Sequence, residues 1–384
     1  MRIAILTQPL HTNYGGILQA YALQTFLQRR GHEVEVINRD YNNRLNLKLL
    51  LLRLGSVIKS FICLVFLGKK ECVVMNPLSP FYHAIWTGYD VLPFVMNYIN
   101  RSKELRTSKA LRNYLKGNVF DCFIVGSDQV WRPCYSPCIT DFFLKEVPKE
   151  TKAIKIAYSA SFGTDQWEFS ELETRECSFL AKQFDLISVR EKSGVMLCEE
   201  YLGISAEHVL DPTMLLDAED YIRLFTEAGA PKTQGNLFCY VLDDNRELEP
   251  IVSYLHSKSF DPVNATLSAV PTKDNPRPYQ MSVERWIKGI YEAEFVVTDS
   301  FHACVFSIIF KKPFVVLGNK DRGNARFDSL LEMFGLQHRR VESCDLFMAA
   351  FDYLKSNSDL VFAQSLLSDY RLNSIGFLKR IELL

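Results

Sequence analysis

The sequence lacks a dominant charge of either sign. Its 44 lysines and arginines nearly balance its 45 aspartates and glutamates, which gives a formal net charge of −1. Without an overall basic field, the chain does not indicate a nucleic-acid-binding protein. Any anion must therefore be bound by local basic groups.

Disulfide and metal-binding patterns are also missing. The ten cysteines include no CxxC pair, and Cys134 and Cys138 have no second pair at zinc-finger spacing. A cysteine in an apolar run, such as Cys122 in DCFIVG, behaves as a small hydrophobic residue, which fits a reducing compartment. No His, Asp and Glu residues cluster at ligand spacing, so we expect no metal and no cofactor.

No secretion signal is visible at the start of the sequence. The chain begins directly with RIAILT, without a basic segment, a long apolar run and a cleavage site. We therefore expect a cytoplasmic protein.

The length and the order of elements predict two α/β domains. At 384 residues, 48% hydrophobic and 23% charged, the chain has a globular composition and room for two cores. Short apolar segments alternate with helical patterns, which is typical of parallel sheets. The strands are predicted at 2–7, 33–37, 121–125, 155–159, 186–189, 208–210, 236–242, 295–298 and 313–317. We place the domains at 1–215 and 216–384, with the last helix able to pack back on the first domain.

Residues 45–67 form a separate apolar segment at helical spacing. Arg44 directly precedes it, Lys48, Arg53 and Lys59 lie within it, and it contains no acidic residue. These cations argue against a spanning helix. Two interpretations stay open: a helix at an anionic membrane surface on the cytoplasmic side, or a helix packed on its own domain.

Three loops of the first half follow predicted strands, where parallel sheets bind ligands. Their residues are candidates either for ligand binding or for turn and cap geometry. The first loop contains Asn13, Tyr14, Gly15 and Gly16; the second contains Gly126, Ser127, Asp128 and Gln129; the third begins with Arg190. The planar guanidinium of Arg190 suits a carboxylate or a phosphate, or a structural ion pair.

Two further groups lie in the second half. His302 follows the strand at 295–298 and opens a helix, which suits proton exchange near neutral pH. Lys320, Arg322 and Arg326 surround Gly323 before another helix. They are candidates for an anion site, the alternative being a solvated loop.

Seven stretches in this order resemble the polysaccharide pyruvyl transferase family. They span residues 3 to 336 and read ILTQPLHTNYGGILQAYALQTFL, FDCFIVGSDQVW, IAYSASFG, ISVREKSG, VLDPTMLL, VVTDSFHACVFSIIF and GNARFDSLLEMFGL. The resemblance implies two Rossmann-like parallel-sheet domains facing a cleft, similar to the GT-B glycosyltransferase fold. It also implies phosphoenolpyruvate as the donor and a sugar of a surface polysaccharide precursor as the acceptor.

The resemblance also implies roles for single residues. Arg190 matches the family's arginine, His302 its histidine, and Lys320, Arg322 or Arg326 its later basic residue, of which we favour Arg326. Better-understood members carry an arginine where this chain has Ser300. We therefore count Arg190, Ser300, Lys320, Arg322 and Arg326 as donor-binding residues. His302 is the expected general acid/base, and Asp128 is expected to orient or deprotonate the acceptor hydroxyl.

The acceptor is expected to be a hexose of a lipid-linked oligosaccharide. Asn13, Tyr14, Gly15, Gly16, Gly126, Ser127 and Gln129 are the expected acceptor-binding residues. Two alternatives remain: a glycosyltransferase of the same architecture that uses a nucleotide sugar, and a non-catalytic glycan-binding homologue.

Overall fold

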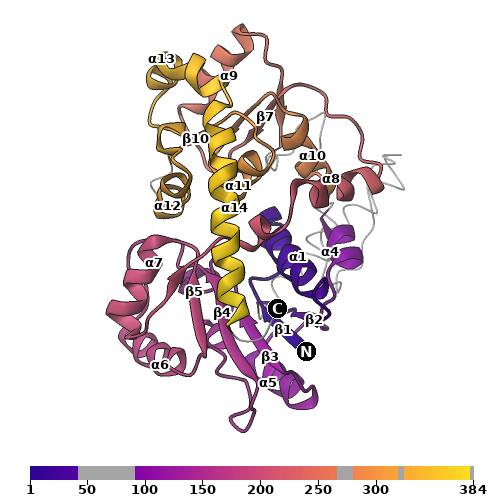
Figure 1. Ribbon diagram of the computed structural model, residues 1–384, viewed down its shortest axis with the longest axis vertical. Helices are drawn as coiled ribbons and strands as arrows, with labels where there is room; N and C mark the ends of the chain where they lie inside the picture. Colours follow the sequence, from indigo (N-terminus) through magenta and orange to yellow (C-terminus); the bar gives the residue numbers. More distant parts are fainter. Residues whose placement is uncertain (42–90, 266–279, 319–323, 381–384) are drawn as a thin grey trace, which may run out of the picture.

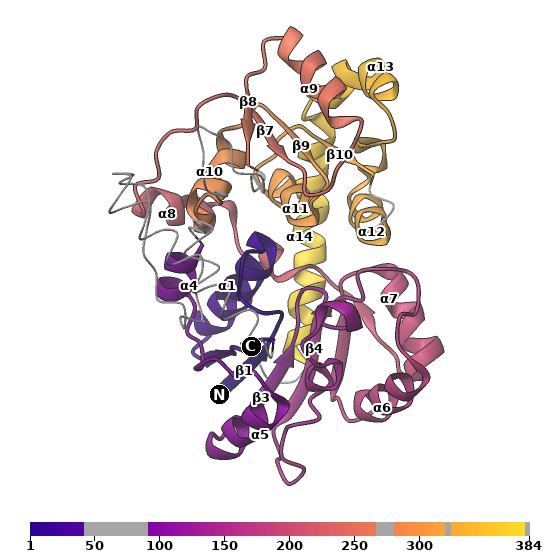
Figure 2. The ribbon, with the colours of Figure 1, turned by 180° about the vertical axis from the view of Figure 1, so that it is seen from behind.

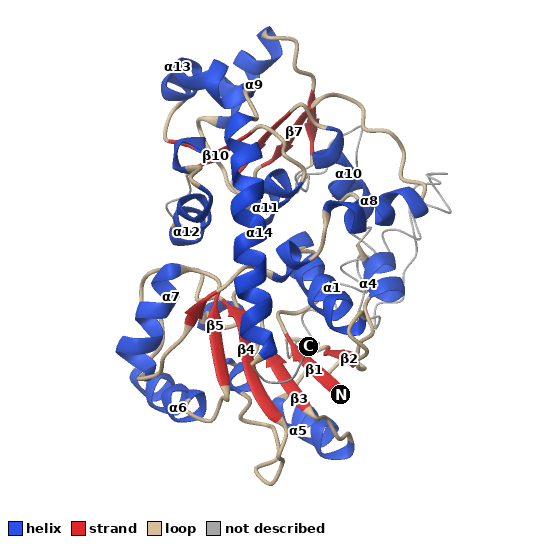
Figure 3. Cartoon of the chain, viewed as in Figure 1, coloured by secondary structure: helices blue, strands red, loops and turns tan. Residues whose placement is uncertain are grey.

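The computed structural model describes residues 1–41, 91–265, 280–318 and 324–380. They form two parallel sheets, each with helices on both faces (Figure 3). The first sheet has the order β2-β1-β3-β4-β5-β6 and the second the order β11-β10-β9-β7-β8. The predicted fold class, two parallel-sheet α/β domains, is confirmed.

The nine predicted strands correspond to β1 to β7, β9 and β10, whereas β8 and β11 were not predicted. Those of the first sheet are β1 (Arg2–Leu6), β2 (Glu33–Ile37), β3 (Cys122–Val125), β4 (Ile154–Ala160), β5 (Leu186–Val189) and β6 (Glu207–His208). Those of the second are β7 (Leu237–Tyr240), β8 (Pro262–Asn264), β9 (Phe295–Thr298), β10 (Phe314–Leu317) and β11 (Arg340–Val341). The central strands are buried on both faces, which explains their continuous apolar sequences.

Helices connect the strands and cover the sheets. In the first half they are α1 (Tyr14–Gln28), α4 (Leu92–Tyr98), α5 (Ser108–Gly117), α6 (Glu171–Ala181) and α7 (Lys192–Leu197). After β6 follow α8 (Ala218–Glu227), α9 (Leu248–Ser257), α10 (Val283–Glu292), α11 (Phe301–Ile309), α12 (Ala325–Phe334), α13 (Cys344–Lys355) and α14 (Ser358–Lys379).

Helix α1 begins at Tyr14, within the stretch from Asn13 to Gly16 that the sequence analysis treats as a loop. The side chain of Asn13 accepts a hydrogen bond from the backbone N–H of Gly15 and caps the helix, so the two glycines belong to its first turn. The helix is buried on almost every side because it packs between the two halves. Its N-terminus therefore faces the residues that lie between the sheets.

The two halves share one hydrophobic core, and α14 runs along both of them (Figure 1). The hydroxyl of Ser374 accepts from the backbone N–H of Leu210 in the first half, and Gln364 donates to the carbonyl of Ile308 in the second. Tyr14 stacks on Trp286 with the ring centroids 5.0 Å apart. These contacts fix the halves against each other.

Some predictions concern residues outside the described ranges. The segment 45–67, Lys320 and Arg322 are among them. In the part of the chain that the structure describes, no helix is long and apolar enough to span a membrane.

Candidate active site

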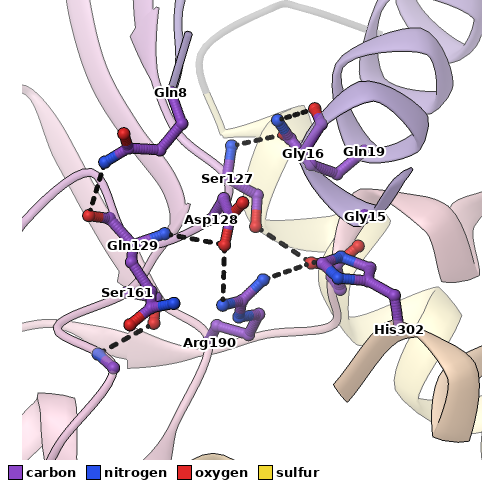
Figure 4. Close-up of polar contacts among 12 residues, drawn as sticks. Gln8, Gly15, Gly16, Gln19, Ser127, Asp128, Gln129, Ser161, Arg190 and His302 are labelled. Atoms are coloured by element: carbon purple, nitrogen blue, oxygen red, sulfur yellow. Dashed lines mark hydrogen bonds and ion pairs between the residues drawn. The ribbon is translucent and has the colours of Figure 1, made fainter. Parts of the chain in front are cut away.

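The loops predicted to bind ligands meet at the carboxyl ends of β1, β3 and β5, opposite the start of α11. Figure 4 shows Asp128, Arg190 and His302 converging there, with Gly15 and Gly16 beside them. Asp128 has a positive φ of 69°, which turns its backbone sharply after β3. One of its carboxylate oxygens accepts from Asn13 at 3.1 Å, and the other accepts from the backbone N–H of Gln129 at 2.9 Å.

Arg190 lies at the centre of a buried ion-pair network. Its two Nη atoms donate to Asp128 at 3.3 Å and to Asp211 at 3.0 Å, and its guanidinium lies 4.4 Å from the ring centroid of Phe301. Burial alone would lower the pKa of Arg190, but the charges of Asp128 and Asp211 outweigh it and raise the pKa. The structural ion pair left open by the sequence is therefore present, and Nε forms no hydrogen bond with any described residue.

Asp211 is the carboxylate that joins the two halves of the site. Its Oδ2 accepts from Arg190 and from the hydroxyl of Ser127 at 3.0 Å, and lies 3.5 Å from Nε2 of His302. Its Oδ1 accepts from the backbone N–H and the hydroxyl of Thr213. Burial would raise the pKa of Asp211, yet His302, Arg190 and these hydrogen bonds hold it well below its usual range.

Arg326, in the first turn of α12, is a buried cation without an ion-pair partner among the described residues. It is only 8% exposed, and its Nε donates to no group in the described part of the chain. Burial, followed by the nearby positive charge of Arg190, lowers its pKa to about 10. Because a buried unpaired guanidinium is costly, this arrangement favours a bound anion.

The neighbourhood of Arg326 has further unsatisfied polar atoms. Nine buried side-chain nitrogen or oxygen atoms of the described residues lack a hydrogen-bond partner. Four of them are Nε of Arg190, Oε2 of Glu191, Oγ of Ser193 and Nε of Arg326. Native proteins satisfy most buried polar groups, so such a concentration indicates a place for a polar ligand.

Helices α7 and α12 hold these residues together across the halves. Figure 2 shows α12 facing α7. The hydroxyl of Ser329 on α12 accepts from the backbone N–H of Lys192 at 2.9 Å, and the ammonium of Lys192 pairs with Glu332 at 3.2 Å. Arg326 is thereby positioned beside Arg190.

The structure brings together most of the predicted site residues, with exceptions. Tyr14 is engaged elsewhere, because its hydroxyl donates to the carbonyl of Met281 in the second half. Gly126 is required by the backbone conformation, because its φ is 118° and an added Cβ would lie 2.3 Å from the carbonyl oxygen of Tyr158. Ser300 is the residue before α11, and its N–H donates to Thr298. The side-chain oxygen of Gln129 accepts a hydrogen bond from Arg132 at 3.2 Å and is therefore engaged within the first half.

Sequence reasoning missed Asp211, Gln19 and Glu191. Asp211 opens the Asp-Pro-Thr turn directly after β6, a strand-end position that could have identified it. Gln19 accepts from the N–H of Ser127 and donates to Thr7, and Glu191 accepts from Ser161 and two backbone N–H groups. Nothing in the sequence around Gln19 signals its role, because it lies within a helix.

A metal site would need a cluster of suitable ligands. Within residues 1–41, 91–265, 280–318 and 324–380, no three His, Cys, Asp or Glu side chains gather in an arrangement that could hold an ion.

Solved structures share this architecture at low sequence identity. UDP-GlcNAc 2-epimerase from Neisseria meningitidis is 12% identical, with a TM-score of 0.52 over 99% of this chain and 100% of that one. The S. aureus MnaA structure with UDP is also 12% identical, with a TM-score of 0.51 over 100% of this chain and 97% of that one. These similarities concern the fold alone. No curated protein sequence matches the chain.

A family model gives the more specific result. The model described as polysaccharide pyruvyl transferase matches residues 13–321, which is more than half of the chain and includes the loops from Asn13 to His302. The chain belongs to the polysaccharide pyruvyl transferase family.

Proposed function

We propose that this protein transfers the enolpyruvyl carbons of phosphoenolpyruvate to a sugar and closes a pyruvate ketal on it. The observation that carries the proposal is Arg326, a buried guanidinium without an acidic partner among the described residues. Phosphoenolpyruvate has both a carboxylate and a phosphate, and a guanidinium binds either group with two parallel hydrogen bonds.

Arg190 and Arg326 have different roles in this proposal, because different charges surround them. Arg190 already pairs with Asp128 and Asp211, so only its Nε is available to a ligand. Arg326 has no such pairing within the described ranges and takes the main part in binding the donor. The hydroxyl of Ser193, which also bonds to none of the described residues, is a further donor at the start of α7.

His302 serves as the general acid/base in this proposal. It gives a proton to the methylene carbon of phosphoenolpyruvate, which becomes the methyl group of the ketal, and a sugar hydroxyl attacks the adjacent carbon. The C–O bond to phosphate breaks, and a second hydroxyl of the same sugar closes the ring. Of the two hydroxyl protons, one restores the proton of His302 and the other leaves with phosphate. Arg326 offsets charge that gathers on the departing phosphate.

Asp128 orients the acceptor hydroxyl in the same scheme. It is buried next to Arg190, at the end of β3. The acceptor we propose is a hexose of a lipid-linked oligosaccharide at the cytoplasmic face of the inner membrane. The cationic, acid-free sequence of residues 45–67 supports this choice, since such a sequence favours contact with anionic lipids.

The test is phosphate release from phosphoenolpyruvate with a panel of lipid-linked galactose, glucose and mannose acceptors. We expect acceptor-dependent release that His302→Gln abolishes while phosphoenolpyruvate still binds. His256→Gln is the control, because this histidine is exposed on α9. Full turnover by His302→Gln would refute its role. Release of a nucleotide from a nucleotide sugar would favour a glycosyltransferase instead, and tight glycan binding without donor turnover a binding protein.

A further inference from the structure

We infer that Asp211 and Gly15 are positioning residues that together fix the imidazole of His302 and make its Nδ1 the proton-transferring atom. The inference rests on the proposed role of His302 and names the groups that prepare it. Both residues come from the first half of the chain, whereas His302 lies on α11 in the second.

Asp211 is held in place by groups of the first half. Ser127, Arg190 and Thr213 all donate to its carboxylate, which is 2% exposed. Its Oδ2 lies 3.5 Å from Nε2 of His302, which is buried and forms no hydrogen bond with any other described residue. The carboxylate is the acceptor that faces this nitrogen, and Asp211 therefore favours a proton on Nε2, as an oriented carboxylate does beside a catalytic histidine.

Gly15 determines how closely the histidine approaches α1. A Cβ added to Gly15 would lie 1.9 Å from Nδ1 of His302 and 2.5 Å or less from two further ring atoms. No side chain of any size fits, so glycine is required here for close approach rather than for an unusual φ. The ring is thus confined between Asp211 on one side and the first turn of α1 on the other.

This confinement selects the reactive nitrogen. Nε2 faces the carboxylate, which leaves Nδ1, beside the N-terminus of α1, for the substrate. With a proton kept on Nε2 by Asp211, the neutral ring accepts a hydroxyl proton at Nδ1, and the imidazolium donates that proton to the methylene carbon. The same nitrogen therefore serves both steps, and its position depends on residues of both halves.

The first experiment determines the tautomer of His302 directly. In protein with nitrogen-labelled histidine, NMR records its two ring nitrogen signals, which are assigned by their loss in His302→Gln. In the wild type we expect the neutral ring to have its proton on Nε2, and in Asp211→Asn we expect the two nitrogen signals to move toward each other, because the carboxylate charge that favours this tautomer is removed. A neutral ring with its proton on Nδ1 in the wild type, or unchanged signals in Asp211→Asn, would overturn the role of Asp211. This measurement needs no acceptor, so it decides the inference even when no turnover is found and the proposed function fails.

The second experiment uses Gly15→Ala, which replaces no charged residue of the site. We expect kcat to fall on the order of 100-fold, because the added Cβ displaces the ring by an ångström or more, while the KM for phosphoenolpyruvate changes little. The control is Gly117→Ala on α5, where an added Cβ meets no atom within 4 Å. Wild-type kcat in Gly15→Ala, or an equal loss in Gly117→Ala, would refute the role of Gly15.

Discussion

Replacing Arg326 with methionine should weaken donor binding and stabilise the protein without its ligand. Methionine retains much of the apolar length of the side chain and removes the charge. Arg326 has no ion-pair partner among the described residues, so no buried carboxylate is left alone by the change. Replacing a buried charge by an apolar group of similar volume is often neutral or stabilising.

The pKa of Arg326 gives the magnitude. Its fall from 12.5 to about 10 corresponds to about 3 kcal/mol against the charged form in the folded protein. Because the folded state lowers the pKa of this cation, the penalty is fully present below about pH 10 and is relieved only above it. Part of the gain in stability is offset, because methionine lacks some of the packing contacts of the longer arginine side chain. We expect the Tm of the ligand-free variant to rise by a few degrees.

Arg339 provides a matched control in the same domain. It is buried, as Arg326 is, but it donates to both carboxylate oxygens of Asp359 and to the carbonyls of Phe314, Leu354 and Ser356. Arg339→Met should therefore destabilise the protein by about 3–5 kcal/mol, since it removes the donor of three backbone carbonyls and leaves Asp359 with His338 as its partner.

The assay is thermal unfolding of both variants and the wild type, with and without phosphoenolpyruvate. A ligand at about 100 times its Kd should stabilise the wild type by about 2.7 kcal/mol, and this shift should be largely absent in Arg326→Met. The reasoning is refuted when Arg326→Met lowers the Tm as much as Arg339→Met does, or when it keeps the full ligand-dependent shift.

Three other predictions follow from the same contacts. The affinity for phosphoenolpyruvate should stay level from about pH 7 to about pH 9 and fall as Arg326 loses its proton near pH 10, which calorimetry across this range would show. Because a bound anion favours the charged form of Arg326, the pH at which the affinity falls should be higher in the complex. Tyr14→Phe should cost about 1 kcal/mol in chemical denaturation, because it leaves the carbonyl of Met281 unpaired, and should not change acceptor KM. Gly126→Ala should lower both Tm and kcat, since the added Cβ meets the carbonyl of Tyr158 and φ is positive; wild-type Tm would contradict this.

Much of the fold could be predicted from the sequence because the strands are apolar and short. β2, β5 and β9 begin and end at the predicted residues. The start of α1 could not be placed, because glycine at 15 and 16 indicates a loop unless the cap by Asn13 and the packing of His302 are known. β11, with two residues, is too short to give a pattern.

Several residues of the candidate site that the sequence identified lie at the ends of strands. Asp128, Arg190 and His302 each follow a strand, and the structure brings all three together. The different states of the two arginines could not be predicted. An arginine looks the same in a sequence whether it is paired, as Arg190 is, or lacks an ion-pair partner among the described residues, as Arg326 does. Only the positions of Asp128 and Asp211 distinguish the two.

The charges of the assembled site divide donor binding between one cation and neutral groups. Arg190 is offset by Asp128 and Asp211, and burial raises the pKa of Glu191, which favours its neutral form. Arg326 is therefore the guanidinium of the described cluster whose charge is left for the donor. Nε of Arg190 and the hydroxyl of Ser193 bond to none of the described residues, and they can contribute hydrogen bonds. The second anionic group of the donor is therefore met by hydrogen-bond donors rather than by a second unpaired guanidinium.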